Sequence, residues 1–217
     1  IIISSEAKDE SVHIPVIISD TGIHEAVYND FYIAAGADVL IVAGCGIHND
    51  GAASSQHDGI HTFHIGRGAR VRYVEKHYGE GEGAGARVLN PQAVVYMEPD
   101  SVCEMEMVQI GGVDSTVRET LAHLDAGAKL IITEKLLTDG VQKAESNIDA
   151  RLDGRGASLR IVSRSVAKGG STQVFHPRAV GNAPCRAHVQ CDSIIMDEAS
   201  IRSIPEIAAR HAEAEIV

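Results

Sequence analysis

The chain has 217 residues, 44% of them apolar, and its 19 basic and 30 acidic residues give a net charge of −11. A chain of this length can bury a real core as one large domain or two small ones. Its negative charge would repel a nucleic-acid backbone or an anionic lipid surface, and no apolar run is long enough to span a membrane. We therefore expect a soluble protein with neither nucleic acid nor a membrane as a partner.

Cysteine usage indicates the compartment. The chain has four cysteines, without the spacing of a disulfide framework and without a secretory leader before them. Thiols of this kind stay free in a reducing environment. We therefore expect a cytoplasmic protein.

A short motif recurs along the chain after residues 1–34, which are predicted to be an irregular lead-in. The clear copies are GADVLI (36–41), GARVRY (68–73), GAKLII (127–132) and GASLRI (156–161), and the degenerate copies are PDSVCE (99–104) and EASIRS (198–203). The aliphatic position falls at Val39, Val71, Val102, Leu130, Leu159 and Ile201, in steps of 32, 31, 28, 29 and 42 residues. The chain therefore repeats about every thirty residues, with one insertion.

Each copy alternates at period two, which is typical of a strand with one buried face, and the preceding Gly or Pro marks a turn. Helical periodicity is nearly absent, and even residues 113–124 favour a strand. A unit of about thirty residues made of short strands cannot bury its own face, so the copies must stack on one another. The pattern predicts an all-β parallel β-solenoid, a single domain over residues 1–217, with a β-sandwich as the alternative fold.

The stretch GCGIHNDGAASSQHDGIHTFHIG, residues 44–66, holds one cysteine and four histidines: Cys45, His48, His57, His61 and His64. These residue types could bind zinc, but only one of the ligands carries sulfur, and His61 and His64 would face opposite sides of a strand. The stretch lies between two copies of the repeat, so we expect mostly a connection on the flank of the solenoid, with partly exposed histidines. A metal-dependent hydrolase built on this stretch stays an alternative.

One glycine-rich segment could suggest a phosphate site. The segment GEGEGAG, residues 79–85, has neither the spacing of a dinucleotide fingerprint nor the Lys-Ser/Thr pair of a phosphate loop. We interpret it as a mobile turn and expect no direct ATP binding.

The second sulfur-bearing stretch is CRAHVQCDSIIMDEASIRSIPEI, residues 185–207. If its first part is extended, Cys185 and Cys191 face the same side, with His188 and Gln190 on the reverse. Two thiols six residues apart on one strand are too far apart to bind the same ion. From the residues alone, both cysteines are most simply explained as small apolar side chains of the core.

Part of this stretch, QCDSIIMDEASIRSIPEI (190–207), resembles the closing segment of the SufB/SufD core family, the scaffold proteins of the Suf system for iron-sulfur cluster assembly. The segments AGCG (43–46) and GRGARVRY (66–73), together with His57, resemble earlier parts of the same family. The resemblance covers residues 35–207 and implies a right-handed parallel β-helix. It also implies a scaffold subunit rather than an enzyme.

The resemblance also implies a site and partners. Cys191 matches the cysteine that SufB-type members place where a nascent, transient iron-sulfur cluster is assembled, whereas SufD-type members need not keep it. Cys45 and His57 match recurrent positions and are alternative metal ligands. The implied partners are an ABC-type ATPase subunit and a second scaffold subunit, either a copy of this chain or a SufB/SufD-like paralogue, docked near residues 160–210. The C-terminal helices of the family, which dock the ATPase, are expected to be missing from this chain.

A carbohydrate-active β-helix enzyme is a further alternative. It would need Asp or Arg side chains clustered on one face of the solenoid, and usually an aromatic platform for a sugar. With three Phe and no Trp in the chain, this alternative has weak support.

Overall fold

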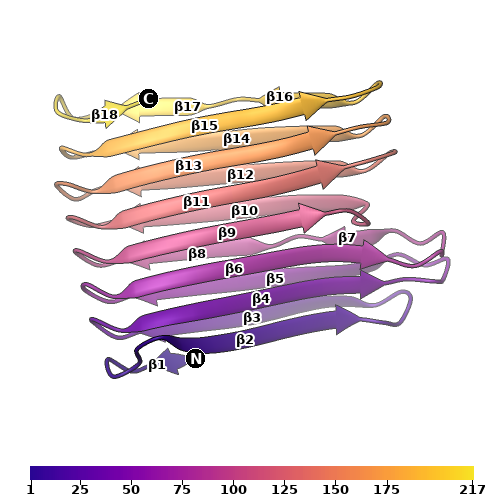
Figure 1. The fold of residues 1–217 in the computed structure, drawn as a ribbon, viewed down its shortest axis with the longest axis horizontal. Helices are drawn as coiled ribbons and strands as arrows, with labels where there is room; N and C mark the ends of the chain where they lie inside the picture. Colours follow the sequence, from indigo (N-terminus) through magenta and orange to yellow (C-terminus); the bar gives the residue numbers. More distant parts are fainter.

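The computed structural model describes residues 1–217 as a stack of β-strands without a helix (Figure 1). It therefore has no helix that could cross a membrane. The strands are β1 (Ile2–Ile3), β2 (Glu10–Ile18), β3 (His24–Ile33), β4 (Asp38–His48), β5 (Ser55–Ile65), β6 (Arg70–Glu80), β7 (Arg87–Leu89), β8 (Gln92–Met97), β9 (Val102–Ile110), β10 (Ser115–Leu124), β11 (Lys129–Thr138), β12 (Lys143–Leu152), β13 (Ser158–Ala167), β14 (Thr172–Gly181), β15 (Arg186–Ile195), β16 (Ser200–Ser203), β17 (Glu206–Ala209) and β18 (Glu215–Ile216).

The strands belong to two sheets that face each other across a narrow core. We call the eight-stranded sheet, in the order β18-β15-β13-β11-β9-β6-β4-β2, sheet B, and the ten-stranded sheet of the remaining strands sheet A. Every pair of neighbouring strands is parallel. The chain alternates between the sheets, so one pass through each makes a coil, and the coils stack from the N-terminus to the C-terminus (Figure 1). The predicted all-β parallel β-solenoid is confirmed.

A ladder of paired inward residues, one from each coil, forms the core side of sheet B. It runs through Val39, Val71, Cys103, Leu130, Leu159 and Ala187, in steps of 32, 32, 27, 29 and 28 residues. None of the six is more than 4% exposed. Because paired residues in neighbouring coils lie about 4.8 Å apart, each side chain packs directly on the next.

The prediction that Val102 and Ile201 belong to this ladder is wrong. Val102 is only partly buried and pairs with Arg70 on the outer side of sheet B, so Cys103 takes its place. Ile201 lies in sheet A, where it pairs with Gln173, and its place in the ladder belongs to Ala187. The predicted insertion therefore does not exist, because the last step of the ladder has 28 residues.

The turns before the strands explain both errors. Most coils enter sheet B through a glycine with a left-handed backbone, such as Gly68 with φ 64°, but Asp100 takes this position with φ 62°. Matching Pro99 instead of Asp100 to the glycines shifts the alternation by one residue and exchanges its two faces. Asp197, with φ 57°, likewise stands where Gly169 opens the preceding strand of sheet A. Aspartate is one of the few residues other than glycine that tolerate this conformation.

The first coil begins before residue 35. Residues 1–34, predicted to be an irregular lead-in, instead contribute β1, β2 and β3, and β2 pairs with β4 along its whole length. The inward positions of β3 include Glu25 and Asn29, which pair with inward histidines of β5. Polar residues at these inward positions hide the hydrophobic alternation that the sequence analysis relied on.

The stretch 44–66 is strand rather than a flanking connection. β4 continues to His48 and β5 starts at Ser55, so only residues 49–54 connect them. His57 and His61 face the core and are each 3% exposed, so the expectation of partly exposed histidines is wrong for both. His64 lies on the outer side of the same strand, which confirms that it and His61 face opposite ways.

The glycines of residues 79–85 allow two connections to stack closely. A Cβ at Gly83 or Gly85 would lie within 2.5 Å of the backbone of residues 50–53. Gly83 and Gly85 donate backbone hydrogen bonds of 3.1 and 2.9 Å to Asn49 and Gly51. The segment predicted to be a mobile turn is therefore tied by hydrogen bonds to the connection of the coil beneath it.

The ladder leads to a stability prediction. Leu130→Ala should lower the free energy of unfolding by about 2–5 kcal/mol, because it opens a cavity between two coils that cannot close over it. Val141→Ala is the control, since Val141 is 85% exposed in a turn and should change the stability by less than about 0.5 kcal/mol. Urea unfolding followed by circular dichroism measures both. Equal urea midpoints for the Leu130→Ala and Val141→Ala variants would contradict the ladder.

Candidate functional site

Cys191 lies in the middle of β15, near the C-terminal end of the stack. Its side chain packs against the main core on the same side of the strand as Cys185, as predicted. The sulfur lies 3.4 Å from the hydroxyl oxygen of Ser193. Of the four cysteines, only Cys191 is not buried.

The strand that carries Cys191 has an open edge. β18 pairs only with Arg186 and Ala187, so from Gln190 onward β15 has a neighbouring strand, β13, on one side only. Beyond the cysteine, Ile194 and Ile195 are 60% and 53% exposed. An unpaired strand edge with exposed apolar side chains is a surface that another chain can cover. A ligand from a second chain could therefore reach the sulfur of this strand.

The other three thiols are protected from deprotonation. Burial, with Glu75 close by, raises the pKa of Cys45 to about 12. Burial likewise raises the pKa of Cys103 to about 12, and it raises the pKa of Cys185. The thiolate is the form that binds metals and attacks electrophiles, so burial makes these three free thiols less ready for either role at neutral pH.

A second inward row crosses sheet B four residues after the aliphatic ladder and ends at Cys191. The row consists of Ala43, Glu75, Met107, Glu134, Ser163 and Cys191, each in register with the next. Glu75, Glu134 and Ser163 are at most 4% exposed. Carboxylates are almost never buried unless they are paired, so the core must supply them with partners.

Arg118, which faces the core from β10 in sheet A, is the partner of both carboxylates. Its guanidinium makes a short ion pair with Glu75, and its Nε lies 3.6 Å from Glu134. The Tyr73 hydroxyl donates a 2.9 Å hydrogen bond to Glu75, and the Ser163 hydroxyl donates one of 3.0 Å to Glu134. These five side chains form a buried ion network, and Ser163 extends it to the coil directly beside Cys191.

The network keeps Glu75 ionised. Burial by itself would raise the pKa of Glu75, but Arg118 and then His77 outweigh burial and hold the pKa well below its usual range. Inside a core of low dielectric, the charges are stable only as a set. Removing Arg118 would leave both carboxylates buried without the cation that they share.

Sequence reasoning did not find this network. The signal is present for Glu75, Glu134 and Ser163, because each lies four residues after a ladder residue and so on the same face of its strand. Arg118 has no such signal, because β10 lies in sheet A and carries no copy of the repeat motif. Only the fold brings it between the two acids.

The sequence also matches a known protein family. A family profile described as "SUF system FeS cluster assembly, SufBD core domain" matches residues 18–216. The chain belongs to the SufBD core family.

Three similar proteins come from archaea, and each is named as an iron-sulfur cluster assembly SufBD family protein. The relative from Methanothermobacter thermautotrophicus is 22% identical over 205 residues, 93% of this chain and 48% of its own length. The relative from Archaeoglobus fulgidus is 22% identical over 194 residues, 88% of this chain and 51% of its own length. The relative from Methanocaldococcus jannaschii is 22% identical over 210 residues, 94% of this chain and 64% of its own length. The chain thus spans about half to two thirds of these relatives.

The alternative ligands Cys45 and His57 lie far from Cys191. Five coil steps separate β4 from β15 in sheet B, which at about 4.8 Å each is about 24 Å. Nδ1 of His57 is hydrogen-bonded to Oε1 of Glu25 at 3.0 Å, and Cys45 packs among aliphatic residues such as Ile47. No group of three or more His, Cys, Asp or Glu side chains in the SufBD chain is placed to hold one metal ion. The hydrolase alternative therefore finds no three-ligand site here.

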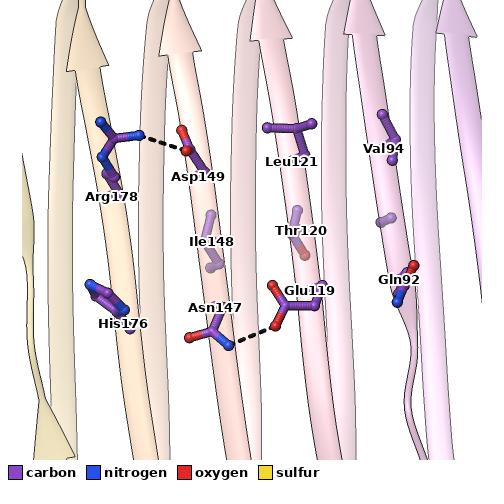
Figure 2. Close-up of a pocket in the computed structure, with 11 residues that line it drawn as sticks. Gln92, Val94, Glu119, Thr120, Leu121, Asn147, Ile148, Asp149, His176 and Arg178 are labelled. Carbon is purple, nitrogen blue, oxygen red and sulfur yellow. Dashed lines mark hydrogen bonds and ion pairs between the residues drawn. The ribbon is translucent and has the colours of Figure 1, made fainter.

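The outer face of sheet A carries an open groove of about 440 Å³ (Figure 2). Its charged groups are largely paired with one another. Arg178 donates a 2.7 Å hydrogen bond to Asp149, and Asn147 donates one of 2.8 Å to Glu119, as the dashed lines in Figure 2 mark. The groove has the Asp and Arg that the carbohydrate-active alternative requires, but no Phe, Tyr or Trp lines it.

The ion network leads to a prediction about pH. Arg118→Met should lower the free energy of unfolding by about 3–5 kcal/mol at neutral pH, because it leaves two carboxylates buried without their cation. The depressed pKa of Glu75 contributes stability above its unfolded value near 4.5, and this contribution is lost as the pH falls through the lower folded value. Without Arg118, Glu75 can take up a proton more readily, so the deficit of the variant should shrink in acid.

The control for this pH prediction is Arg160→Met, on the exposed side of β13. This change removes the same charge but leaves no buried group without a partner. It should therefore change the free energy of unfolding very little at every pH. Urea unfolding at several pH values measures both variants. A deficit of the Arg118 variant that stays constant down to pH values below the usual carboxyl range would contradict the network.

Proposed function

We propose that this SufBD chain is a SufB-like scaffold subunit, on which Cys191 supplies a thiolate to a nascent iron-sulfur cluster. The observation that carries the proposal is that Cys191 is the one cysteine that is not buried, and it lies on the open edge of β15. Family membership supplies the chemistry, because the matching profile describes cluster assembly. A scaffold of this kind holds and releases its cargo rather than converting a substrate, so we propose that the chain is not an enzyme.

The surroundings of Cys191 support a role as a ligand because the side chain is accessible, and not because of the charges near it. Iron-sulfur clusters are held mainly by cysteine thiolates, and one strand cannot supply several of them to one cluster. The neighbouring Asp192 is engaged by Arg164, whose Nε lies 3.6 Å from the carboxylate, and by Gln190, which donates a 2.9 Å hydrogen bond to it. The acid beside the thiol therefore has an ion pair and a hydrogen bond of its own.

The remaining ligands would come from a second subunit. We propose that the open edge of β15 pairs with a copy of this chain or with a SufB/SufD-like paralogue, over residues 160–210. Exposed apolar side chains support this, among them Ile194, Ile195, Ile204 and Ile207. Ligands from two chains could then converge on one cluster.

The energy source and the place of action complete the proposal. No phosphate-binding loop is evident in the sequence, so an ABC-type ATPase subunit of the Suf system is proposed as the source of energy. We propose the cytoplasm as the place of action, because all four cysteines are unpaired and a reducing compartment keeps thiols free.

Cluster reconstitution tests the role of Cys191. After anaerobic incubation with iron and sulfide, Cys191→Ser should lose most of the bound iron and sulfide and the cluster absorbance, because a hydroxyl is a poor ligand for this chemistry. Fold and oligomeric state should stay as in the parent, since the side chain lies at the edge of the core.

The matched controls are Cys45→Ser and Cys185→Ser, which remove buried thiols with raised pKa values. Both should keep the cluster as long as circular dichroism shows the parent fold. If Cys191→Ser binds as much iron and sulfide as the parent, the chain is a SufD-like structural partner and the proposed site is wrong.

Light scattering tests the second subunit. Ile195→Glu should weaken self-association or pairing with a paralogue about tenfold or more, because it places a charge on the edge that an interface would desolvate. Val141→Glu places the same charge on a distant exposed turn and should leave association unchanged. A parent chain that stays monomeric at high concentration, alone and with SufBD paralogues, would rule out the proposed interface.

A further inference from the structure

Two buried histidines of β5 face the same small space inside the second coil. His57, Gly59 and His61 are successive inward residues of this strand. Gly59 has no side chain, and a Cβ built on it would lie 3.2 Å from Nε2 of His57 and 3.5 Å from Nε2 of His61. Residues four apart on a strand are about 13 Å apart along the backbone, so the two rings reach this space only because both lean over the glycine.

Each imidazole contacts, through its Nδ1, the residue paired with it in β3. Glu25 pairs with His57 and lies 3.0 Å from its Nδ1, and Asn29 pairs with His61 and lies 3.4 Å from its Nδ1. The carboxylate of Glu25 fixes the proton of His57 on Nδ1, which leaves Nε2 as a free lone pair. For His61, the atom that lies at this distance is the amide nitrogen Nδ2 of Asn29, and a half-turn of the amide would present its oxygen and do the same. Metal-binding histidines in proteins are oriented in this way.

Nε2 of His61 has no partner. It is buried and makes no hydrogen bond, although the residue is only 3% exposed. The ring centroids of Phe31, Phe63 and Tyr73 lie 6.0–6.4 Å from the centroid of the His61 imidazole, and these rings keep the imidazole in place. An unsatisfied buried nitrogen of this kind points to a missing water or ion.

We propose that the space over Gly59 is a second metal site, in which Nε2 of His57 and of His61 bind a transition-metal dication such as Fe²⁺, Zn²⁺ or Co²⁺. Imidazole suits these ions, and the carboxylate of Glu25 offsets part of the buried charge. The Glu25 side chain is 38% exposed, which gives solvent a path to the ring that it holds. Because no third His, Cys, Asp or Glu converges here, water or an exchangeable ligand takes the other positions.

The site is independent of the proposed role of Cys191. It lies in the second coil, five coil steps from β15, and it contains no sulfur ligand. The site would therefore take up a metal ion without sulfide and without a second subunit.

Anaerobic titration of the full chain with Co²⁺, without iron or sulfide, tests the site. Calorimetry should show one bound ion per chain, and the visible spectrum should show nitrogen ligation without a thiolate charge-transfer band. Gly59→Ala should abolish binding, because the added methyl occupies the space while both ligands remain. Gly44→Ala is the matched control, because Gly44 also lies within a strand and a Cβ there meets nothing within 4 Å.

Two further variants allow a decision even if the methyl group added by Gly59→Ala disturbs folding. Glu25→Gln, at a partly exposed position, should weaken Co²⁺ binding about 10- to 100-fold, as the loss of an orienting partner does at other metal sites. Cys191→Ser should bind Co²⁺ like the parent. The proposal is overturned if the parent binds no Co²⁺, if a folded Gly59→Ala variant or Glu25→Gln binds it as tightly as the parent, or if Cys191→Ser abolishes binding.

Discussion

Each coil of this protein can bury its inner face only against the coils next to it, because a unit of about thirty residues has no core of its own. The register between neighbouring strands is therefore the constraint on which the rest of the structure depends, since a slip of one residue would exchange the inward and outward faces. Five of the turns into sheet B maintain this register with a left-handed residue. These residues are Gly36, Gly68, Asp100, Gly127 and Gly156, and each donates its backbone N–H to the corresponding turn of the next coil.

The same register places polar residues in rows as strictly as aliphatic ones. Glu75 and Glu134 face the core because they stand at inward positions of their strands, and Arg118 from the opposite sheet makes their burial possible. Replacing such a network by apolar residues can stabilise a protein, whereas breaking it is costly, so its presence points to a purpose other than stability. In this chain it brings polar, hydrogen-bonded side chains up to the residue paired with Cys191.

Two sites with different access follow from the stacking of the coils. Cys191 lies on a strand edge that a second chain can cover, so its proposed chemistry would depend on a partner. His57 and His61 lie inside the stack, held by Glu25 and Asn29 from the coil beneath, so their site is complete within one chain. A SufBD scaffold with this arrangement would hold sulfur ligands at an edge and nitrogen ligands in its interior.

The amino-acid sequence by itself determined the parallel solenoid, because a recurring Gly-Ala turn followed by period-two alternation leaves stacking as the way to bury the aliphatic residues. It also singled out Cys191, through the segment that resembles the SufB/SufD core family. It did not reveal the strands of residues 1–34 or the N-terminal half of β5, because Glu25, Asn29 and His57 occupy inward positions without being hydrophobic. Nor did it place Val102 and Ile201 correctly, because Asp100 and Asp197 take turn positions that a pattern assigns to glycine. Only the tertiary structure decided which polar side chains meet in the core, because Arg118 and its two acids come from different sheets and from coils far apart in the sequence.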